Sequence, residues 1–384
     1  MARRIGIFCD SYRPENKAVA VRMYHFAQAF ASVGYDVTVT TTTKEKEPSP
    51  FPVRIQTNWT TAPSNLQSNV VRLLSELVMG VELFLRILFK RYDVVLLSSP
   101  PFLASSLGAL ASKIKGIPFI FDVRDEYPEV YFAANLLLPS SLAGKILLNL
   151  ESGIYRNSLL VISVTEGICR RITQKCPGAT VRLVRNGYDA TRFFPEQKHY
   201  ETFTVVFHGN MGKFQDPDLI LRLAAKAQEE RRNIEFLIIG WGNNDSAVNE
   251  QELTNVRYMG MVNYEDISAT IARAHLGISF RTNDLISKNA FPVKLYEYIG
   301  VAIPAIITPK SEAGKFFEAN EIGYEFDPDE WQNIYDRIIY LSEHPDEISR
   351  LRRNLLKKRG NFSRNAISDD LVKTVTALLD LSRN

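Results

Sequence analysis

The feature of the sequence that most constrains its fold is a regular alternation of short apolar segments with amphipathic segments. The apolar segments are rich in Val, Ile and Phe, as in strands that are buried on both faces of a parallel sheet. The amphipathic segments repeat their apolar residues at helical spacing, and some end at a glycine such as Gly34 or Gly116. This alternation predicts an α/β fold in which helices cover both faces of parallel sheets.

The alternation stops at residues 188–202 and then restarts, which predicts two doubly wound halves. Strands are expected at residues 3–10, 35–43, 92–101, 117–125, 159–165 and 181–187, and again at 204–210, 234–242, 256–260, 276–280, 304–308 and 322–326. Helices are expected at residues 20–34, 69–93, 106–116, 167–176, 217–230, 264–274 and 313–320. We assign residues 1–195 to a first domain and 196–368 to a second. Residues 369–384 are expected to form a C-terminal helix that can pack back on the first domain.

The composition is that of an ordinary globular protein, with 45% hydrophobic and 23% charged residues among 384. Cys9, Cys169 and Cys176 show neither metal-ligand spacing nor a paired framework, which suits a reducing compartment. The N-terminal apolar run is too short for a secretory signal. Together with the cysteines, this predicts a cytoplasmic protein. The histidines also lack the spacing of metal ligands, so we expect no metal site.

The charge is distributed unevenly, since residues 1–200 carry +8 and the remainder −5. Such an asymmetry predicts an anionic partner for the first half. The sequence shows no basic stripe with interleaved aromatic residues, no helix-turn-helix and no zinc spacing. We therefore expect a membrane surface rather than nucleic acid.

Candidate ligand-binding residues follow the predicted strands, at the sheet edge where α/β proteins bind their ligands. With two such sheets facing each other, the expected site is the cleft between them. After residues 204–208 comes a glycine loop that contains Gly209, Gly212 and Lys213. Glycines and a helix N-terminus suit a phosphate, although a plain strand-to-helix turn explains the same residues.

A second candidate segment contains Arg281, Lys288, Lys294 and Glu297. A helix that begins near Val293 would direct its N-terminus and these cations at a diphosphate, and a carboxylate one turn later can accept hydrogen bonds from a ribose. An exposed Lys/Glu pair on a surface helix is the alternative.

A third candidate segment, residues 121–132, concentrates charge after a strand, with Arg124 and Asp125 at its centre. Paired carboxylates bind metal or act as acid and base. A solvated acidic turn is the alternative, and the position at a strand end favours function for Asp125.

Residues 69–93 form an unusual predicted helix. Arg72, Glu76, Glu82, Arg86 and Lys90 fall on one third of its circumference, and the rest is apolar. The charges are too frequent for a membrane-spanning helix. The segment is either a core helix covered on nearly all sides or a helix that lies in the membrane interface, and the apolar segment 130–150 adds to the same half.

Taken in order, the segments resemble the family 4 retaining glycosyltransferases, which have the GT-B fold of two Rossmann-like domains. The resemblance covers almost the whole chain and is carried by residues 12–41, 184–195, 208–224, 237–242, 256–280 and 289–297, the last on the family's E-x7-E signature. The variants AVAVR (18–22), VRDEYP (123–128) and PVKLYEY (292–298) are most similar to the branch that builds O-antigen, capsule and exopolysaccharide on lipid-linked acceptors.

The resemblance implies residue roles. Glu297 would hold the donor ribose, while Asn289 stands at the first glutamate of the signature. Asn210 and Gln215 stand at the usual Arg and Lys of the phosphate loop, so a cation among Lys213, Arg281 and Lys294 would neutralise the diphosphate. The implied catalytic residues are Asp125, Asn289 and Glu297. The implied donor site is Gly209, Asn210, Gly212, Lys213, Gln215, Gly240, Arg281, Ala290, Phe291, Pro292, Lys294 and Glu297, and the implied acceptor site is Tyr12, Arg22, Arg124 and Asp125.

The resemblance implies a retaining transferase that moves a sugar from a nucleoside-diphosphate donor to a lipid-linked saccharide, without metal or other cofactor. Lys17 and Ala18 replace the glycine pair of the first domain. Two alternatives stay open: a nucleotide-sugar 2-epimerase of the same fold, and a non-catalytic partner that binds nucleotide-sugar or lipid.

Overall fold

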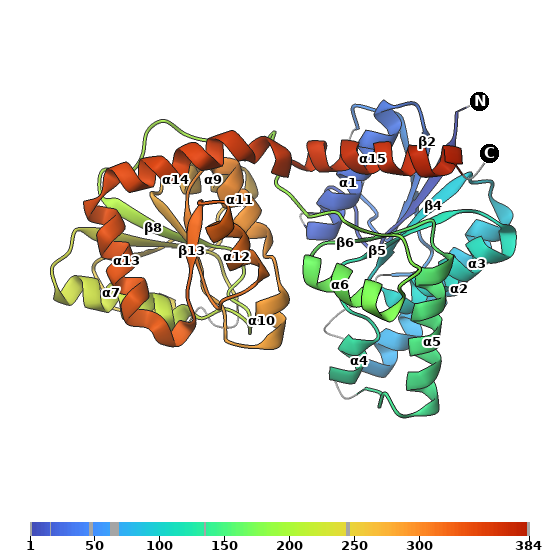
Figure 1. The fold of residues 1–384 in the computed structure, drawn as a ribbon, viewed down its shortest axis with the longest axis horizontal. Helices are drawn as coiled ribbons and strands as arrows, with labels where there is room; N and C mark the ends of the chain where they lie inside the picture. Colours follow the sequence, from blue (N-terminus) through green and yellow to red (C-terminus); the bar gives the residue numbers. More distant parts are fainter. Residues whose placement is uncertain are drawn as a thin grey trace. The chain divides into compact units, whose positions relative to one another are not determined.

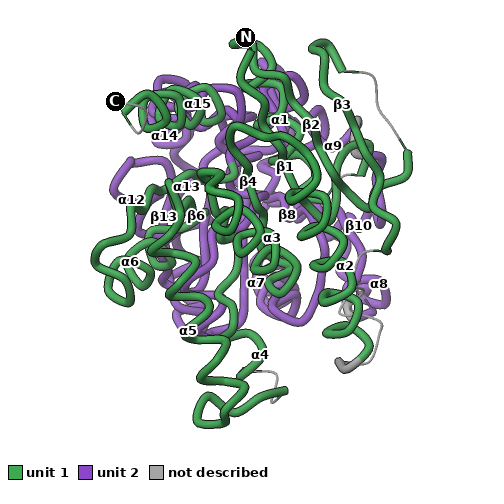
Figure 2. Tube along the Cα trace, turned by 90° about the vertical axis from the view of Figure 1, so that its right-hand side faces the viewer, with its two compact units in different colours: residues 1–186, 367–384 green, residues 187–366 purple. Residues whose placement is uncertain are grey.

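The computed structural model describes residues 2–15, 17–45, 49–61, 69–133, 136–242 and 246–381, and the chain divides into two compact units (Figure 2). Unit 1 contains residues 1–186 and 367–384, and unit 2 contains residues 187–366. Residues 134–135 of the apolar segment 130–150 and residues 382–384 of the expected C-terminal helix lie outside the described residues.

Unit 1 is built on a seven-stranded sheet in the order β3-β2-β1-β4-β5-β6-β7, in which all neighbouring strands are parallel (Figure 1). Its strands are β1 (Arg4–Phe8), β2 (Asp36–Thr41), β3 (Val53–Thr57), β4 (Val94–Ser99), β5 (Phe119–Val123), β6 (Leu160–Ser163) and β7 (Val181–Leu183). Its helices are α1 (Ala18–Ser32), α2 (Asn69–Phe89), α3 (Phe102–Lys115), α4 (Glu129–Ala133), α5 (Leu142–Asn157) and α6 (Glu166–Lys175), with α15 (Arg364–Leu381) entering from unit 2.

Unit 2 is built on a six-stranded parallel sheet in the order β10-β9-β8-β11-β12-β13. Its strands are β8 (Phe203–His208), β9 (Ile234–Ile239), β10 (Val256–Tyr258), β11 (Leu276–Ser279), β12 (Ala305–Ile307) and β13 (Gly323–Glu325). Its helices are α7 (Pro217–Glu229), α8 (Ser246–Asn249), α9 (Tyr264–Ala272), α10 (Leu285–Asn289), α11 (Val293–Val301), α12 (Glu312–Ala319), α13 (Trp331–Glu343) and α14 (Pro345–Lys358), with the short 3-10 helices η1 (Pro328–Glu330) and η2 (Arg359–Phe362).

Each sheet separates two hydrophobic cores, because successive strand residues point to opposite faces. In β1, Ile7 joins a core that contains Phe26 of α1 and Leu371 of α15. The next residue, Phe8, joins the core on the other face with Leu83 of α2. The prediction of two doubly wound parallel sheets is therefore confirmed. Strand β3 was missed, since its residues are half-buried at the sheet edge and show no clean apolar pattern.

The limits of the units differ from the sequence-based domain limits by a few residues. Residues 187–195 belong to unit 2, because Tyr188 exchanges backbone hydrogen bonds with Phe362 and Arg364. On the described part of the C-terminal helix, Leu371 and Val375 are buried in the core of unit 1.

Helix α2 turns the acidic members of its charged stripe toward the rest of unit 1. Glu76 and Glu82 are buried, at 0% and 4% exposure. Glu76 accepts a hydrogen bond from the hydroxyl of Tyr131 at 2.7 Å, and Glu82 accepts one from the backbone N–H of Trp59 at 2.9 Å. The two carboxylates thus accept hydrogen bonds from neighbouring segments of unit 1. The side of α2 that faces away from the core is apolar.

The most buried ion pair of unit 1 joins α1 to β5. Arg22 and Asp122 are 2% and 0% exposed, and Arg22 Nη2 lies 2.9 Å from Asp122 Oδ1. Arg22 also donates to the carbonyl of Arg185 at 3.0 Å, and the hydroxyl of Ser98 donates to Asp122 at 3.2 Å. A buried charge that is paired in this way becomes costly when its partner is removed.

We predict that Asp122→Ala destabilises the protein by about 3–5 kcal/mol, because it leaves the Arg22 guanidinium buried without its counterion. The double variant Arg22→Met, Asp122→Leu should recover most of that loss, since it removes both charges. Urea denaturation measures both effects, with Asp36→Ala, which breaks the more exposed pair to Arg54, as the control of small effect. Equal stability of Asp122→Ala and the control would contradict this account.

Candidate functional site

The glycine loop after β8 is fixed by its neighbour after β9. The N–H of Gly209, whose φ is +112°, donates to the carbonyl of Ile239, and that of Met211 donates to Trp241. A Cβ at Gly240 would lie 2.0 Å from the carbonyl oxygen of Gly209. Glycine is therefore required at position 240 by backbone packing, which explains this residue without a ligand.

The side chains of this loop differ in their exposure and in their contacts. Asn210 and Lys213 are exposed, Gly212 is partly buried, and Gln215 is half-buried before α7. The Oε1 of Gln215 accepts a hydrogen bond from Lys294 Nζ at 3.1 Å. The loop and the first turn of α11 thus meet through Gln215 and Lys294.

Two cations lie at this strand edge, a buried Lys294 and a partly exposed Arg281. Lys294 is 9% exposed, and its Nζ lies 3.7 Å from the centre of the Phe207 ring. Burial, with the charge of Arg281 as a second cause, lowers the pKa of Lys294 to about 7. Burial also lowers the pKa of Arg281, whose Nε donates to the hydroxyl of Ser287 at 3.3 Å. Lys288, in contrast, is exposed on α10.

Glu297 lies one turn after Lys294 and is paired with a histidine that the sequence analysis had set aside. Its Oε2 lies 3.4 Å from Nε2 of His208, and the two residues are 9% and 3% exposed. Burial raises the pKa of Glu297 to about 7, against the nearby charges of Arg364 and Lys294. Burial lowers the pKa of His208 to about 3, so the imidazole is neutral at pH 7.

The segment from Asn289 to Pro292 leads into α11. Asn289 is the last residue of α10, and Ala290 follows in extended conformation. The ring of Phe291 is buried and stacks on Tyr296 with 4.4 Å between centroids, so this side chain is a core anchor. Pro292 precedes α11 with no side-chain cap, and it has no N–H to donate.

The sequence offered different signals for the two residues that were missed. His208 ends β8 directly before Gly209, and this strand-end position was the available signal. Arg364 is 4% exposed and acts on Glu297 electrostatically. It lies far along the chain after η2, so no local pattern points to it.

In unit 1, charged residues gather at the carboxyl ends of β1 and β5. Nη2 of Arg124 lies 3.5 Å from Asp10 Oδ1 and donates to the carbonyl of Pro100 at 2.6 Å. Asp125 is exposed. Reduced solvation and the carboxylate of Asp10 raise its pKa, against Arg124 and Arg72, and reduced solvation is the largest of these effects. This group has the composition of a site that binds a polar ligand and exchanges a proton.

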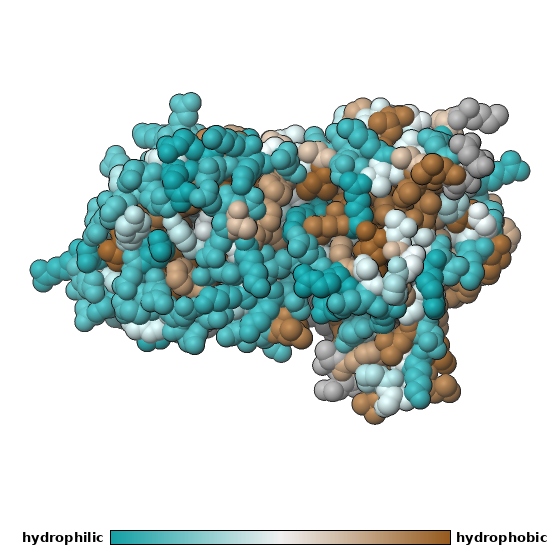
Figure 3. Space-filling model, in the orientation of Figure 1, coloured by the Kyte–Doolittle hydropathy of each residue, from teal (hydrophilic) through white to brown (hydrophobic). Residues whose placement is uncertain are grey.

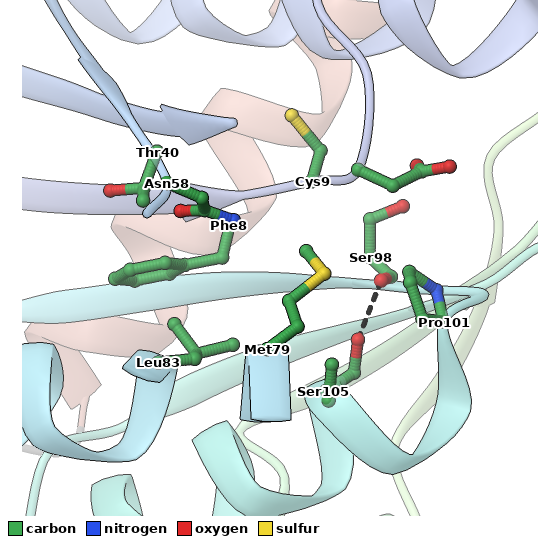
Figure 4. A pocket seen from close by; sticks show the side chains of 11 residues that line it. Phe8, Cys9, Thr40, Asn58, Met79, Leu83, Ser98, Pro101 and Ser105 are labelled. Carbon is green, nitrogen blue, oxygen red and sulfur yellow. Dashed lines mark hydrogen bonds between the residues drawn. The ribbon is translucent and has the colours of Figure 1, made fainter. Parts of the chain in front are cut away.

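A pocket lies beside these residues (Figure 4). Asp10 and Ser98 contribute polar groups, while Phe8, Met79 and Leu83 form its apolar side. In Figure 4, Met79 rises from α2 toward Cys9, and Ser105 donates a hydrogen bond to the carbonyl of Ser98 at 2.6 Å. The pocket thus combines a polar strand edge with the apolar side chains of α2.

Two of the expected acceptor residues are not at the surface. Arg22 is fully engaged with Asp122 and Arg185, so its expected contact with an acceptor is replaced by a structural role. Tyr12 is 2% exposed, and its ring packs beside Tyr24. Arg124 and Asp125 are thus the members of the expected acceptor set that solvent reaches.

Metal ligands and membrane-spanning helices are both absent from the part of the chain that the structure describes. In that part, no cluster of three or more His, Cys, Asp or Glu side chains has the arrangement of metal ligands. No helix of the same ranges combines the length and the apolar character that crossing a bilayer requires.

Comparisons with known proteins connect this geometry to a family. Residues 17–187 match the model described as a glycosyl transferase 4-like domain, and residues 189–366 match the model of glycosyl transferases group 1. Together the two models match more than nine-tenths of the chain. A comparison with curated protein sequences found no match.

Solved structures of similar fold include HepE from Anabaena in complex with UDP, with a TM-score of 0.70 and 14% identity over 98% of this chain and 100% of that one. Sucrose-phosphate synthase from Thermosynechococcus elongatus has a TM-score of 0.68 and 15% identity over 99% and 100% of the two chains. WaaG, a glycosyltransferase involved in lipopolysaccharide biosynthesis, has a TM-score of 0.67 and 13% identity over 97% and 99%. The two family models and the shared fold agree, and the chain therefore belongs to the GT4-type glycosyltransferases, with their GT-B fold of two Rossmann-like domains.

Proposed function

We propose that the protein is a retaining glycosyltransferase that moves a hexosyl or N-acetylhexosaminyl group from a nucleoside-diphosphate sugar to a lipid-linked saccharide. It would act on the inner face of the cytoplasmic membrane, as a peripheral protein, in the synthesis of a cell-surface polysaccharide. The observation that carries the proposal is the charged cluster of Lys294, Glu297 and Arg281 at the carboxyl edge of the unit 2 sheet, in which Lys294 and Glu297 are buried and Arg281 is partly exposed.

The cluster suits a nucleotide-sugar because its charges match the parts of such a donor. A cation beside the glycine loop suits the diphosphate, and a carboxyl group one turn further along α11 suits the ribose hydroxyls. Asn289, with the backbone of Ala290 and Phe291, would face the transferred sugar. The chain's own cations would then stabilise the leaving diphosphate, without a resident metal.

The solved structures of similar fold support this choice of donor. HepE from Anabaena has been solved with UDP, with UDP and glucose, and with UDP-glucose. WaaG is involved in lipopolysaccharide biosynthesis, and a cell-surface polysaccharide is the product that we propose for the present chain.

We propose that unit 1 binds the acceptor through Arg124 and Asp125. Arg124 would hold a phosphate or sugar oxygen, and Asp125 would orient the acceptor hydroxyl. Its raised pKa reflects the reduced solvation that is common at functional carboxyl groups.

The membrane contact rests on the apolar surface of unit 1. Exposed aliphatic and aromatic side chains follow one another at helical spacing along the outer side of α2: Val71, Leu74, Leu77, Val78, Val81, Leu85 and Phe89. Ile114 of α3 and Leu142 of α5 add to the exposed apolar residues. Figure 3 shows hydrophobic atoms gathered at the tip of unit 1 around α4 and α5, whereas the visible face of unit 2 is mostly hydrophilic.

Basic residues border this apolar surface, which favours an anionic lipid surface as the occupant. Arg91 follows α2, Lys113 lies on α3 and Lys145 on α5, and all three are exposed. Apolar residues with basic neighbours are typical of helices that lie in the membrane interface. The interfacial interpretation of residues 69–93 is thus retained, with the apolar stripe rather than the charged one exposed.

The two alternative functions make different predictions for turnover. A 2-epimerase would convert a nucleotide-sugar without any acceptor. A non-catalytic partner, which the asparagine at position 289 suggests, would bind the donor and never consume it.

For the donor site, we predict that Glu297→Gln weakens nucleotide-sugar binding at least about tenfold, because the amide offers the ribose one acceptor oxygen where the carboxylate offers two. The same change should raise the melting temperature at pH 8 and leave it unaltered at pH 5. The carboxyl pKa is raised to about 7 in the folded state, so the folded protein loses stability as pH rises from about 4.5 to 7.

Thermal melts of both proteins at pH 5 and pH 8 measure that difference, which we expect to be about 5 °C at pH 8. At that pH Lys294 is mostly neutral and no longer compensates the carboxylate. Unchanged donor affinity in Glu297→Gln would remove the proposed role of this residue.

For the acceptor site, we predict that Asp125→Asn lowers kcat about 100-fold and leaves donor affinity unaltered, because the lost carboxylate acts on the acceptor hydroxyl alone. Transfer from a labelled nucleotide-sugar into membrane lipid extract gives kcat, and calorimetry gives donor affinity. Glu129→Gln, also exposed but engaged by Lys175, is the control. An equal loss of donor affinity in Asp125→Asn would contradict the assignment.

For the membrane surface, we predict that the triple variant Leu74→Ser, Val78→Ser, Val81→Ser binds vesicles of phosphatidylethanolamine and phosphatidylglycerol at least about tenfold more weakly, since it removes exposed apolar area. The three positions are exposed, so the variant should stay folded, and a thermal melt checks this. Met261→Ser with Leu356→Ser, both exposed on unit 2, is the matched control. A wild-type protein that does not bind the vesicles and instead dimerises through this surface would contradict the proposal.

A further inference from the structure

Lys294 and Arg281 form an arrangement of charge that the folded protein alone does not explain. Lys294 is buried and Arg281 is partly exposed, and the charge of Arg281 disfavours the protonated form of Lys294. The carboxylate of Asp284 favours the charged form of Arg281, whose pKa is nevertheless lowered because burial outweighs it. Among the described residues, neither cation lies within 4.0 Å of a carboxylate oxygen; the contacts are an amide oxygen of Gln215 for Lys294 and a hydroxyl of Ser287 for Arg281. Buried cations normally have a counterion, so an anion is the missing partner.

The position of Lys294 identifies where that anion binds. A Cβ at Gly209 would lie 3.7 Å from Nζ, so the ammonium lies directly beneath the glycine loop. The backbone of the same loop joins Arg281, since Gln215 and Arg281 form a β-bridge. Loop, ammonium and guanidinium thus surround one place at the carboxyl edge of β8 and β11.

The other charged groups of the loop do not compete for this role. Lys213 is exposed, and Asn210 and Gln215 carry no charge. The amide of Gln215 instead orients the ammonium by accepting its hydrogen bond. The ammonium of Lys294 lies over the Phe207 ring, with Nζ 3.7 Å from its centre.

We propose that Lys294 and Arg281 are the cation pair that holds the diphosphate of the donor, with Gln215 positioning the Lys294 ammonium. The inference rests on the proposed function, which supplies the donor, and it names the cation that the sequence left open among three. A lysine on the helix then performs the role that a charged side chain in the glycine loop would otherwise have.

The neighbouring titratable groups predict how binding depends on pH. Glu297 on α11 favours the charged form of Lys294, Arg281 disfavours it, and His208 on β8 is neutral. A bound diphosphate adds negative charge and raises the pKa of Lys294, so binding takes up protons above about pH 7. Affinity should therefore fall as pH rises from 6.5 to 9.

The test is calorimetric titration with UDP, GDP, ADP and dTDP, each beside its uncharged nucleoside. For the nucleotide that binds the wild type, Lys294→Met should lose on the order of 30-fold in diphosphate affinity, and nucleoside affinity should not change. Lys294→Arg, which stays charged at every pH, should retain affinity and show a weaker pH dependence. Lys315→Met, which removes an exposed cation on α12 of the same unit, is the control and should bind normally.

A charge exchange tests the geometry itself. In the double variant Gln215→Lys, Lys294→Met, the cation returns to the loop side of the 3.1 Å contact. It should recover at least about tenfold of the lost diphosphate affinity. A double variant no better than Lys294→Met would show that the two positions do not share one anion, contrary to the proposal.

The outcomes separate this inference from the proposed function. A wild type that binds none of the four diphosphates overturns both. Diphosphate binding that is the same in wild type and Lys294→Met overturns only the cation assignment. An equal loss of nucleoside and diphosphate affinity would mean that Lys294 shapes the site without holding phosphate, and it would also overturn the assignment.

Discussion

The position of α11, and with it that of the proposed donor site, depends on one buried tyrosine. The hydroxyl of Tyr298 lies 3.0 Å and 3.1 Å from the carbonyl oxygens of Val206 in β8 and Ile278 in β11, and it donates its proton between them. Its ring fits because residue 277 is glycine; a Cβ there would lie 2.8 Å from the ring. This contact fixes the rotation and the height of α11 on the sheet. Lys294 and Glu297, one turn apart on α11, therefore reach the carboxyl edge of the sheet.

In unit 1, too, buried polar contacts fix the helices and strands that present the exposed residues of the proposed acceptor site and membrane surface. The Arg22–Asp122 pair joins α1 to β5, directly before Arg124 and Asp125. On α2, Glu76 and Glu82 satisfy neighbouring loops, and Gly80 packs against α3, where a Cβ would lie 2.7 Å from Leu107. With its polar groups and its glycine turned inward, α2 presents its remaining apolar residues to the outside.

The sequence predicted the α/β fold and nearly every strand, because buried parallel strands and glycine-ended helices leave local patterns. The strand-end rule pointed to Arg281, the helix expected near Val293 pointed to Lys294 and Glu297, and Gln215 was named only through the family resemblance. The sequence could not predict the pairing of His208 with Glu297 or the approach of Arg364, which depend on distant segments. It placed Arg22 at the acceptor, although burial commits this residue to Asp122. The edge strand β3 carries no periodic signal and was missed for that reason.

Centrally, we propose that the charged cluster of Lys294, Glu297 and Arg281 holds a nucleotide-sugar whose sugar is transferred to a lipid. The most direct measurement incubates the protein with UDP-, GDP-, ADP- and dTDP-sugars, with and without bacterial membrane lipid extract, and follows both donor and lipid by mass spectrometry. The account predicts that one donor is consumed only when the extract is present, and that a lipid gains the mass of one sugar. Conversion of a donor without lipid, or binding without any consumption, would contradict it.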